Sequence, residues 1–191
     1  MDLALDKTAS QIRRDIVRMV AGASSGHPGG SLGCADFLTV LYFDVMNIDP
    51  RNFDMDGMNE DIFYLSNGHI SPVWYSVLAR RGYFPVNELS TFRKLSSRLQ
   101  GHPSTDKGLP GVRMASGSLG QGLSVAIGTA EAKKLIISKY LESHQYQAAY
   151  LFDDSMDNIR SFLQLKKVFP KIRIIPKHVD DTMINENKFL N

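Results

Sequence analysis

The chain has 191 residues, of which 43% are hydrophobic and 22% are charged, the profile of one globular domain with a buried core. A net charge of +2 gives no reason to expect nucleic acid or a membrane surface as a partner. A single cysteine excludes an intrachain disulfide, and no apolar run approaches the roughly 20 residues of a membrane span. The N-terminus does not read as a signal peptide, and we expect the protein in the cytoplasm.

Apolar residues at helical spacing predict helices over 3–21, 35–46, 71–81, 87–95 and 119–140. Glycines at 122 and 128 of the last helix suggest close packing. Between these helices we expect a glycine-rich loop over 22–33 and a polar loop over 47–60. Residues 61–65 form a short, nearly continuous apolar run, which is typical of a buried parallel strand ending in a functional loop.

The last third predicts strands over 148–152 and 171–175, a helix over 156–168 and a frayed polar end over 180–191. Strands that alternate with helices indicate an α/β fold, a parallel sheet flanked by helices. Ligands of such sheets bind beyond the carboxyl ends of the strands.

Four glycine- or proline-rich segments stand out, and three of them carry a histidine. They are Ser-Gly-His-Pro-Gly-Gly at 25–30, Leu-Ser-Asn-Gly-His at 65–69, Gln-Gly-His-Pro at 100–103 and Ser-Gly-Ser-Leu-Gly-Gln-Gly at 116–122. Glycine allows close backbone approach and proline fixes a turn, so such loops hold imidazoles where a ligand can meet them.

In this order, the segments resemble the N-terminal, thiamine-diphosphate-binding region of transketolases over residues from about 11 to 135. The matching stretches extend to Ser-Leu-Gly at 31–33 and include Leu-Pro-Gly-Val at 109–112 and Leu-Ser at 123–124. The resemblance implies a thiamine-diphosphate-binding fold, incomplete here. It also implies a division into a transketolase-like region, 1–135, and a diverged or fused tail, 136–191, that completes or extends the sheet.

The resemblance also assigns site residues. His27 and His102 would be catalytic, contacting the sugar hydroxyls and carbonyl oxygen, and His69 would lie nearer the thiazolium and diphosphate. The backbone of Gly117, Ser118 and Leu119 would contact the aminopyrimidine ring of thiamine diphosphate. Histidine suits proton transfer near neutral pH because its ordinary pKa is about 6.5. We expect the four loops to converge on one cavity at the carboxyl edge of the sheet.

The metal site is the main departure from the family. Transketolases carry Gly-Asp-Gly after a strand to hold Mg²⁺ or Ca²⁺ on the diphosphate, and this motif is absent. Asp153 and Asp154, at the end of a predicted strand, are weaker candidates. Phe-Asp-Asp-Ser at 152–155 also resembles the metal loop of haloacid-dehalogenase-type phosphatases, but their Asp-x-Asp nucleophile segment near the start is missing, and plain structure is the commoner explanation of so short a motif.

Three functions remain open. The first is a transketolase-type protein that transfers a two-carbon ketol unit between sugar phosphates and needs a second copy of itself, a C-terminal transketolase subunit, or both. The second is a non-catalytic remnant or fusion that lacks the metal–diphosphate motif. The third, a small phosphohydrolase built on the tail, is disfavoured. We expect the isolated chain to bind thiamine diphosphate with Mg²⁺ weakly and to be inactive.

Overall fold

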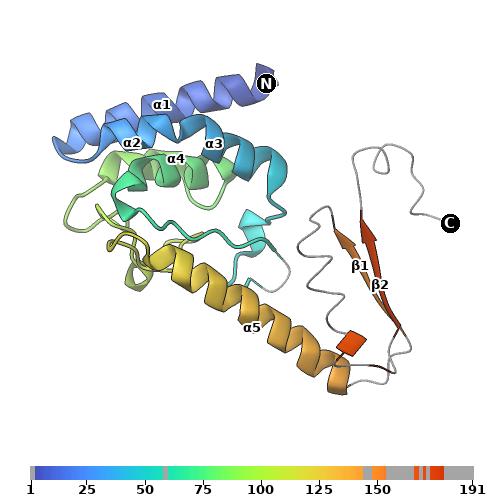
Figure 1. The fold of residues 1–191 in the computed structure, drawn as a ribbon. Coiled ribbons are helices and arrows are strands. Elements are labelled where there is room, and N and C mark those ends of the chain that lie inside the picture. The colour runs from blue at the N-terminus through green and yellow to red at the C-terminus, as the bar shows by residue number, and fades with distance from the viewer. Residues whose placement is uncertain are drawn as a thin grey trace. The chain divides into compact units, whose positions relative to one another are not determined.

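The structure is a computed structural model that describes residues 3–57, 60–143, 148–153, 166–167, 170 and 173–178. The chain forms two compact units, residues 1–129 and 130–191, each described here by itself. The first unit is helical (Figure 1). Its α-helices are α1 (Leu3–Ala23), α2 (Pro28–Gly33), α3 (Ala35–Val40), α4 (Ser71–Arg81) and the start of α5 (Gln121–Ser143). Its shorter elements are a π-helical turn, η1 (Leu41–Val45), and the 3₁₀ turns η2 (Pro50–Asn52), η3 (Gly68–Ile70), η4 (Val86–Thr91) and η5 (Thr105–Lys107).

Helix α4 is the centre of the first unit, and α1, α2 and α3 pack on it (Figure 1). Proline at its first turn suits the start of the helix, and Gly82, with φ +102°, ends it by accepting the left-handed conformation. Every residue of α4 from Ser71 to Ala79 is buried. Trp74 is one of the largest buried side chains, and its indole Nε1 donates to the Tyr42 hydroxyl at 2.8 Å.

A buried carboxylate joins α1 to α4. Asp15 is 5% exposed and accepts from Arg80 Nη2 at 3.0 Å and from the Ser76 hydroxyl at 2.8 Å. Burial alone would raise the pKa of Asp15, but hydrogen bonds from Arg80, Ser76 and Gln11 outweigh it and hold the pKa below its ordinary value. Asp15 and Arg80 therefore join the two helices as a charged pair.

The helix predictions hold in part. The helix at 71–81 has the predicted bounds, and those at 3–21 and 119–140 are confirmed with ends shifted by two or three residues. The 35–46 helix begins as predicted but finishes in the π-helical turn η1, where Met46 N–H donates to Leu41 O at 2.8 Å. Two expectations are wrong: 22–33 contains helix α2, and 87–95 holds only the 3₁₀ turn η4. Pro28 at the first position of α2 explains the former.

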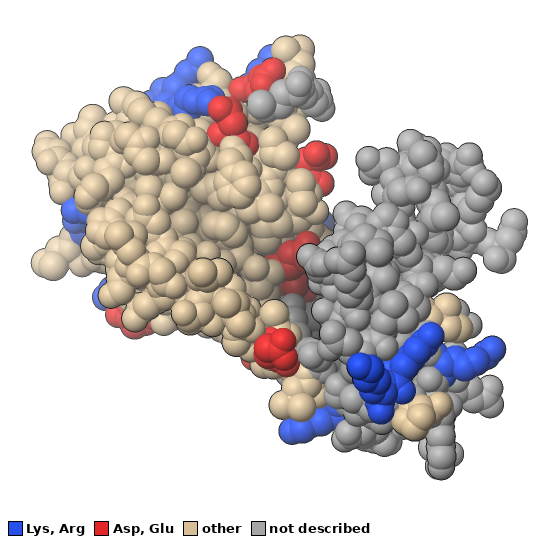
Figure 2. Space-filling view, in the orientation of Figure 1, with Lys and Arg blue, Asp and Glu red and all other residues tan. Residues whose placement is uncertain are grey.

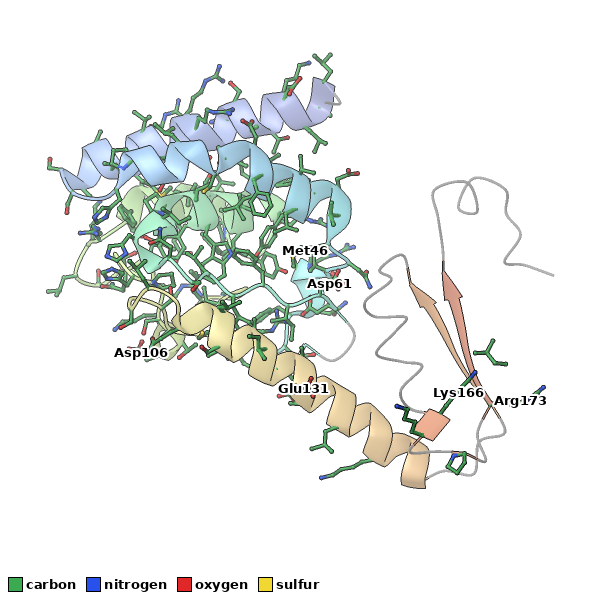
Figure 3. The ribbon with its side chains drawn as sticks, in the orientation of Figure 1. Met46, Asp61, Asp106, Glu131, Lys166 and Arg173 are labelled. Atoms are coloured by element: carbon green, nitrogen blue, oxygen red, sulfur yellow. The ribbon has the colours of Figure 1, made fainter. Side chains whose placement is uncertain are left out.

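Residues 61–65 are not a strand, which corrects the sequence prediction. Asp61 is instead fixed by loop contacts beside Met46 (Figure 3): its N–H donates to Asn47 O at 2.9 Å, and its carboxylate accepts from Asn47 N–H at 2.7 Å. The apolar run serves side-chain packing, because the Phe63 ring meets both the Tyr42 and the Trp74 rings edge-on at 5.7 Å. An apolar run can thus be buried without pairing with a neighbouring strand.

The second unit contains two strands in its described part. β1 (Ala148–Asp153) and β2 (Arg173–His178) pair in parallel, with Ala148 opposite Arg173 and Asp153 opposite His178. These strands correspond to the predicted ones at 148–152 and 171–175, the second starting two residues later. The predictions for 180–191 and for most of the 156–168 helix lie outside the described residues. A larger parallel sheet flanked by helices therefore stays a prediction.

The surface of the first unit is sparsely charged on the face shown in Figure 2, with Lys and Arg side chains at its margins. Among the helices of the described residues, none has the length and apolar character needed to cross a membrane.

Candidate functional site

The structure brings three histidines from three separate loops into one cluster. The His27 and His69 rings meet edge-on with centroids 5.0 Å apart, and the His69 and His102 rings do so at 4.8 Å. Because these loops lie far apart in the sequence, only the tertiary fold can join them. His27 and His102 are exposed and His69 is half-buried between them.

His27 is placed by the turn that joins α1 to α2. It occupies the residue before α2, and Gly26 before it has φ +136°. A side chain at Gly26 would also press on Val20 Cγ2 at 3.1 Å, so this position requires glycine on two counts. Ser25 N–H donates to Val20 O at 3.2 Å, which folds the loop back on the end of α1.

His69 lies in the 3₁₀ turn η3 and is braced by its neighbour Asn67. The Asn67 side-chain oxygen accepts from the His69 backbone N–H at 3.3 Å and lies 3.1 Å from His69 Nδ1. When Nδ1 carries the proton it donates to Asn67, which leaves Nε2 free to face a ligand.

His102 is held from both sides of its turn. From α4, the Ser71 hydroxyl donates to Gly101 O at 2.7 Å and the Tyr75 hydroxyl donates to Gln100 O at 2.9 Å. On the other side, Ser116 N–H donates to Pro103 O at 3.1 Å. The backbone on each side of the imidazole is therefore fixed by a hydrogen bond.

The fourth loop reaches the same cluster. A side-chain carbon built on Gly117 would lie 3.9 Å from the His102 ring. One built on Gly68 would lie 2.5 Å from Ser116 O, and one on Gly122 would lie 2.6 Å from Ser66 Cα, so glycine alone permits these backbones to approach. Ser118 and Leu119 are exposed between Gly117 and α5.

The electrostatics of the cluster favour neutral imidazole at His102. Partial burial lowers the pKa of His102, and the positive charges of His69, Arg93 and His27 lower it further. An unprotonated imidazole at neutral pH can both accept and donate a proton, which is what acid–base chemistry on a bound hydroxyl or carbonyl requires.

Arg93 is the residue near this cluster that the sequence did not indicate. Its Nη1 donates to the Ser25 hydroxyl at 2.8 Å, and its guanidinium lies against Gly101. It stands in a polar stretch after a short 3₁₀ turn, and nothing in that stretch distinguishes it from a solvated surface arginine.

The candidate metal ligands belong to the second unit. Asp153 is the last residue of β1, and Asp154 lies outside the described residues. Among the residues that are described, no group of three or more histidine, cysteine or acidic side chains is arranged to hold a metal ion.

The loops that carry these imidazoles are among the segments on which the sequence resemblance rests, and comparison with known proteins shows the same family. Residues 5–152 match the family model of the transketolase, thiamine diphosphate binding domain. The chain belongs to this family. The match runs past residue 135 and takes in most of β1.

Relatives and solved structures point to the same family. The chain is 43% identical over 136 residues to one of the subunits of an apulose-4-phosphate transketolase from Actinobacillus succinogenes, covering 71% of this chain and 48% of that protein. It is 44% identical over 138 residues to transketolase 1 of Saccharomyces cerevisiae, covering 71% of this chain and 20% of the yeast protein. The chain thus spans about half of the first relative and a fifth of the second.

The fold agrees as well. Transketolase from Leishmania mexicana superposes with a TM-score of 0.67 at 30% identity, covering 88% of this chain and 26% of that one. A Pichia stipitis transketolase in complex with sedoheptulose-7-phosphate superposes with a TM-score of 0.63 at 34% identity, covering 78% and 22%.

Proposed function

We propose that this chain is the cofactor-binding part of a transketolase-type enzyme, which transfers a two-carbon ketol unit between sugar phosphates. The observation that carries the proposal is the meeting of His27, His69 and His102 beside Gly117. Each of these residues comes from a different loop, and each loop matches the corresponding stretch of the family. A chance motif would not bring all four together.

The described residues fit one end of thiamine diphosphate. Ser118 and Leu119, next to Gly117, are exposed residues, and their main-chain polar groups would contact the aminopyrimidine ring. His69 would lie nearer the thiazolium, and bound thiamine diphosphate would supply the electron sink that stabilises a carbanion. The diphosphate end has less support, because Gly-Asp-Gly is absent and Asp153 is the one described candidate for Mg²⁺ or Ca²⁺.

His27 and His102 would bind and orient the sugar. Both imidazoles are exposed, so they can reach its hydroxyls and carbonyl oxygen. His102, unprotonated at neutral pH, would exchange a proton with the sugar oxygen, and its N–H would stabilise negative charge as it develops there.

A partner chain would complete the site. The relative from Actinobacillus is one subunit of its enzyme, which suggests that this chain also works with a second polypeptide. As that partner we propose a C-terminal transketolase subunit, with a second copy of this chain as a further one and the cytoplasm as their location. The partner would supply the acidic group that activates the pyrimidine.

The second candidate is a non-catalytic member of the family. The missing Gly-Asp-Gly favours it, since a diphosphate without its metal is hard to hold. Calorimetry with thiamine diphosphate and Mg²⁺ tests the cofactor, and weak or absent binding is expected for the isolated chain. Low-micromolar, Mg²⁺-dependent binding would contradict this and would implicate Asp153 or Asp154.

Activity separates the two candidates. A coupled sugar-phosphate assay should show no turnover for the chain alone and turnover with a C-terminal transketolase subunit. In that complex His102→Ala should lower kcat by about 10² to 10³, because a donor to a developing oxyanion acts mainly in the transition state. His102→Gln, which keeps an N–H donor, should lose less. No turnover with any such partner supports the non-catalytic member, and turnover by the chain alone would contradict the need for a partner.

A further inference from the structure

Arg93 connects the loops that carry two of the clustered histidines. Its Nη1 donates to the Ser25 hydroxyl at 2.8 Å, two residues before His27. A side-chain carbon on Gly101 would lie 2.7 Å from the Arg93 guanidinium carbon and Nη2, so the guanidinium packs on the backbone directly before His102. The same side chain thus contacts both loops within two residues of an imidazole.

The backbone of Arg93 is held in an unfavourable conformation. Its φ of +59° lies in the left-handed region, which costs a residue with a side chain about 1 kcal/mol or more. The conformation is fixed by Arg93 N–H, which donates to Leu99 O at 2.8 Å, and by the burial of Phe92. Glycine would adopt this conformation freely, yet the position carries a long cationic side chain.

The charge of Arg93 has no acidic counterpart in the described part of the molecule. No ion pair involves it there, and its Nε is buried without a hydrogen-bond partner. Its guanidinium carbon lies 5.6 Å from the centre of the Phe92 ring. By contrast Arg80, Arg98 and Arg113 each pair with a carboxylate. An unneutralised guanidinium near His102 disfavours protonation of that imidazole.

We propose that Arg93 is a positioning residue that ties the His27 loop to the His102 loop and places a fixed positive charge against the backbone that carries His102. The charged or titratable groups that act on His102 in the described structure are His69, Arg93 and His27, and the guanidinium of Arg93 is a permanent positive charge. The catalytic importance of Arg93 rests on the proposed function, but its effect on the cluster does not.

The test is an NMR titration of the histidine ring protons in the full chain, which needs neither cofactor nor turnover. Arg93→Met keeps length and removes charge, so the midpoint for His102 should shift upward. Arg93→Lys keeps the charge and should restore much of the low midpoint. Lys94→Met removes the same charge from the exposed neighbouring residue and should leave the midpoint nearly unchanged. Equal shifts in Arg93→Met and Lys94→Met would overturn the electrostatic half of the proposal.

The second readout is the set of ring-to-ring nuclear Overhauser contacts between His27, His69 and His102. Ser25→Ala removes the hydrogen bond and keeps the charge, so the His27–His69 contact should weaken while the His102 midpoint stays low. Arg93→Met should weaken the contact and raise the midpoint together. Unchanged contacts in both variants would overturn the positioning half of the proposal, in which Arg93 ties the His27 loop to the His102 loop. If Arg93→Met does not fold, Arg93→Gln removes the charge and Ser25→Ala removes the hydrogen bond, so the two halves are still decided separately. Failure to find ketol transfer would leave both readouts standing.

Discussion

Helix α4 and the start of α5, which both belong to the first unit, are held in different ways. In α4 the large apolar side chains are buried, with Leu78 at 0% exposure. At the start of α5 they are not, since Leu123 is 65% and Ile127 is 58% exposed. Two other contacts join the start of α5 to the rest of the unit: Gly122 lies against Ser66, and the Thr129 and Tyr64 hydroxyls form a hydrogen bond at 3.0 Å. Burial of apolar side chains thus holds α4 in place, whereas a close backbone approach holds the start of α5.

The largest expected effect contrasts two leucines. Leu78→Ala should lower the free energy of unfolding of the first unit by about 2–5 kcal/mol, because it removes a fully buried side chain and leaves a cavity. Leu123→Ala should change it by less than about 0.5 kcal/mol, since the side chain is exposed. Urea unfolding measures both. Similar losses at the two positions would mean that α5 is held by apolar burial after all.

The next largest effect is expected at the ion pair between Asp15 of α1 and Arg80 of α4. Asp15→Asn should destabilise the unit by about 3 kcal/mol, because it leaves the partly buried Arg80 without its countercharge. Asp106→Asn makes the same substitution at an exposed residue, which is labelled in Figure 3, and should leave the free energy of unfolding nearly unchanged. Equal stability of the two variants would show that the pair contributes nothing beyond packing.

Two glycines in α5 sharpen the comparison further. Gly122→Ala should destabilise by about 1–3 kcal/mol, since the methyl group would meet the Ser66 backbone at 2.6 Å. Gly128→Ala meets nothing within 4 Å and should stabilise by about 0.5–1 kcal/mol through better helix propensity. Thermal melts of the two variants check the contrast. A stabilising Gly122→Ala would remove the close approach as the anchor of α5.

The smallest effect is a pH dependence. Because the pKa of His102 is lowered on folding, the unfolded chain binds this proton more readily, so stability falls as pH drops from about 6.5 toward the lowered pKa. The effect should be small, since the imidazole is largely exposed. Melts at about pH 7.5 and about pH 5.5, on either side of the ordinary histidine pKa, should differ less for His102→Gln than for the parent chain. An equal difference would assign the dependence to other groups.

Strong local signals made parts of the fold predictable. Residues 71–81 carry a proline in the first turn and a glycine directly after the helix, and the predicted bounds are correct. Residues 61–65 failed because periodicity cannot separate a buried strand from an irregular segment that packs its aromatic side chains. In 87–95 the helical spacing was present, but only a 3₁₀ turn formed before the chain reversed at Arg93.

Some residues of the candidate site could likewise be predicted from the sequence, and others could not. The three histidine loops were recognisable from motif order, and the structure brings their imidazoles together. Arg93 could not be found, because its importance depends on contacts with Ser25 and Gly101, which lie far away or across a turn in the chain. Its positive φ, fixed by Leu99, is a tertiary property without a local sequence signature.

The two close glycine contacts have a mechanical consequence. Gly68 lies against Ser116, in the segment before α5, and Gly122 lies against Ser66 in the first turn of α5, so the 66–69 segment and the start of α5 approach closely at two points. One contact would still allow the helix start to rotate about it, whereas two contacts restrict both rotation and sliding of the helix start against the 66–69 segment. The turn that carries His69 is therefore tied to the first turn of α5, and we expect a substitution there to affect the middle ring of the histidine cluster.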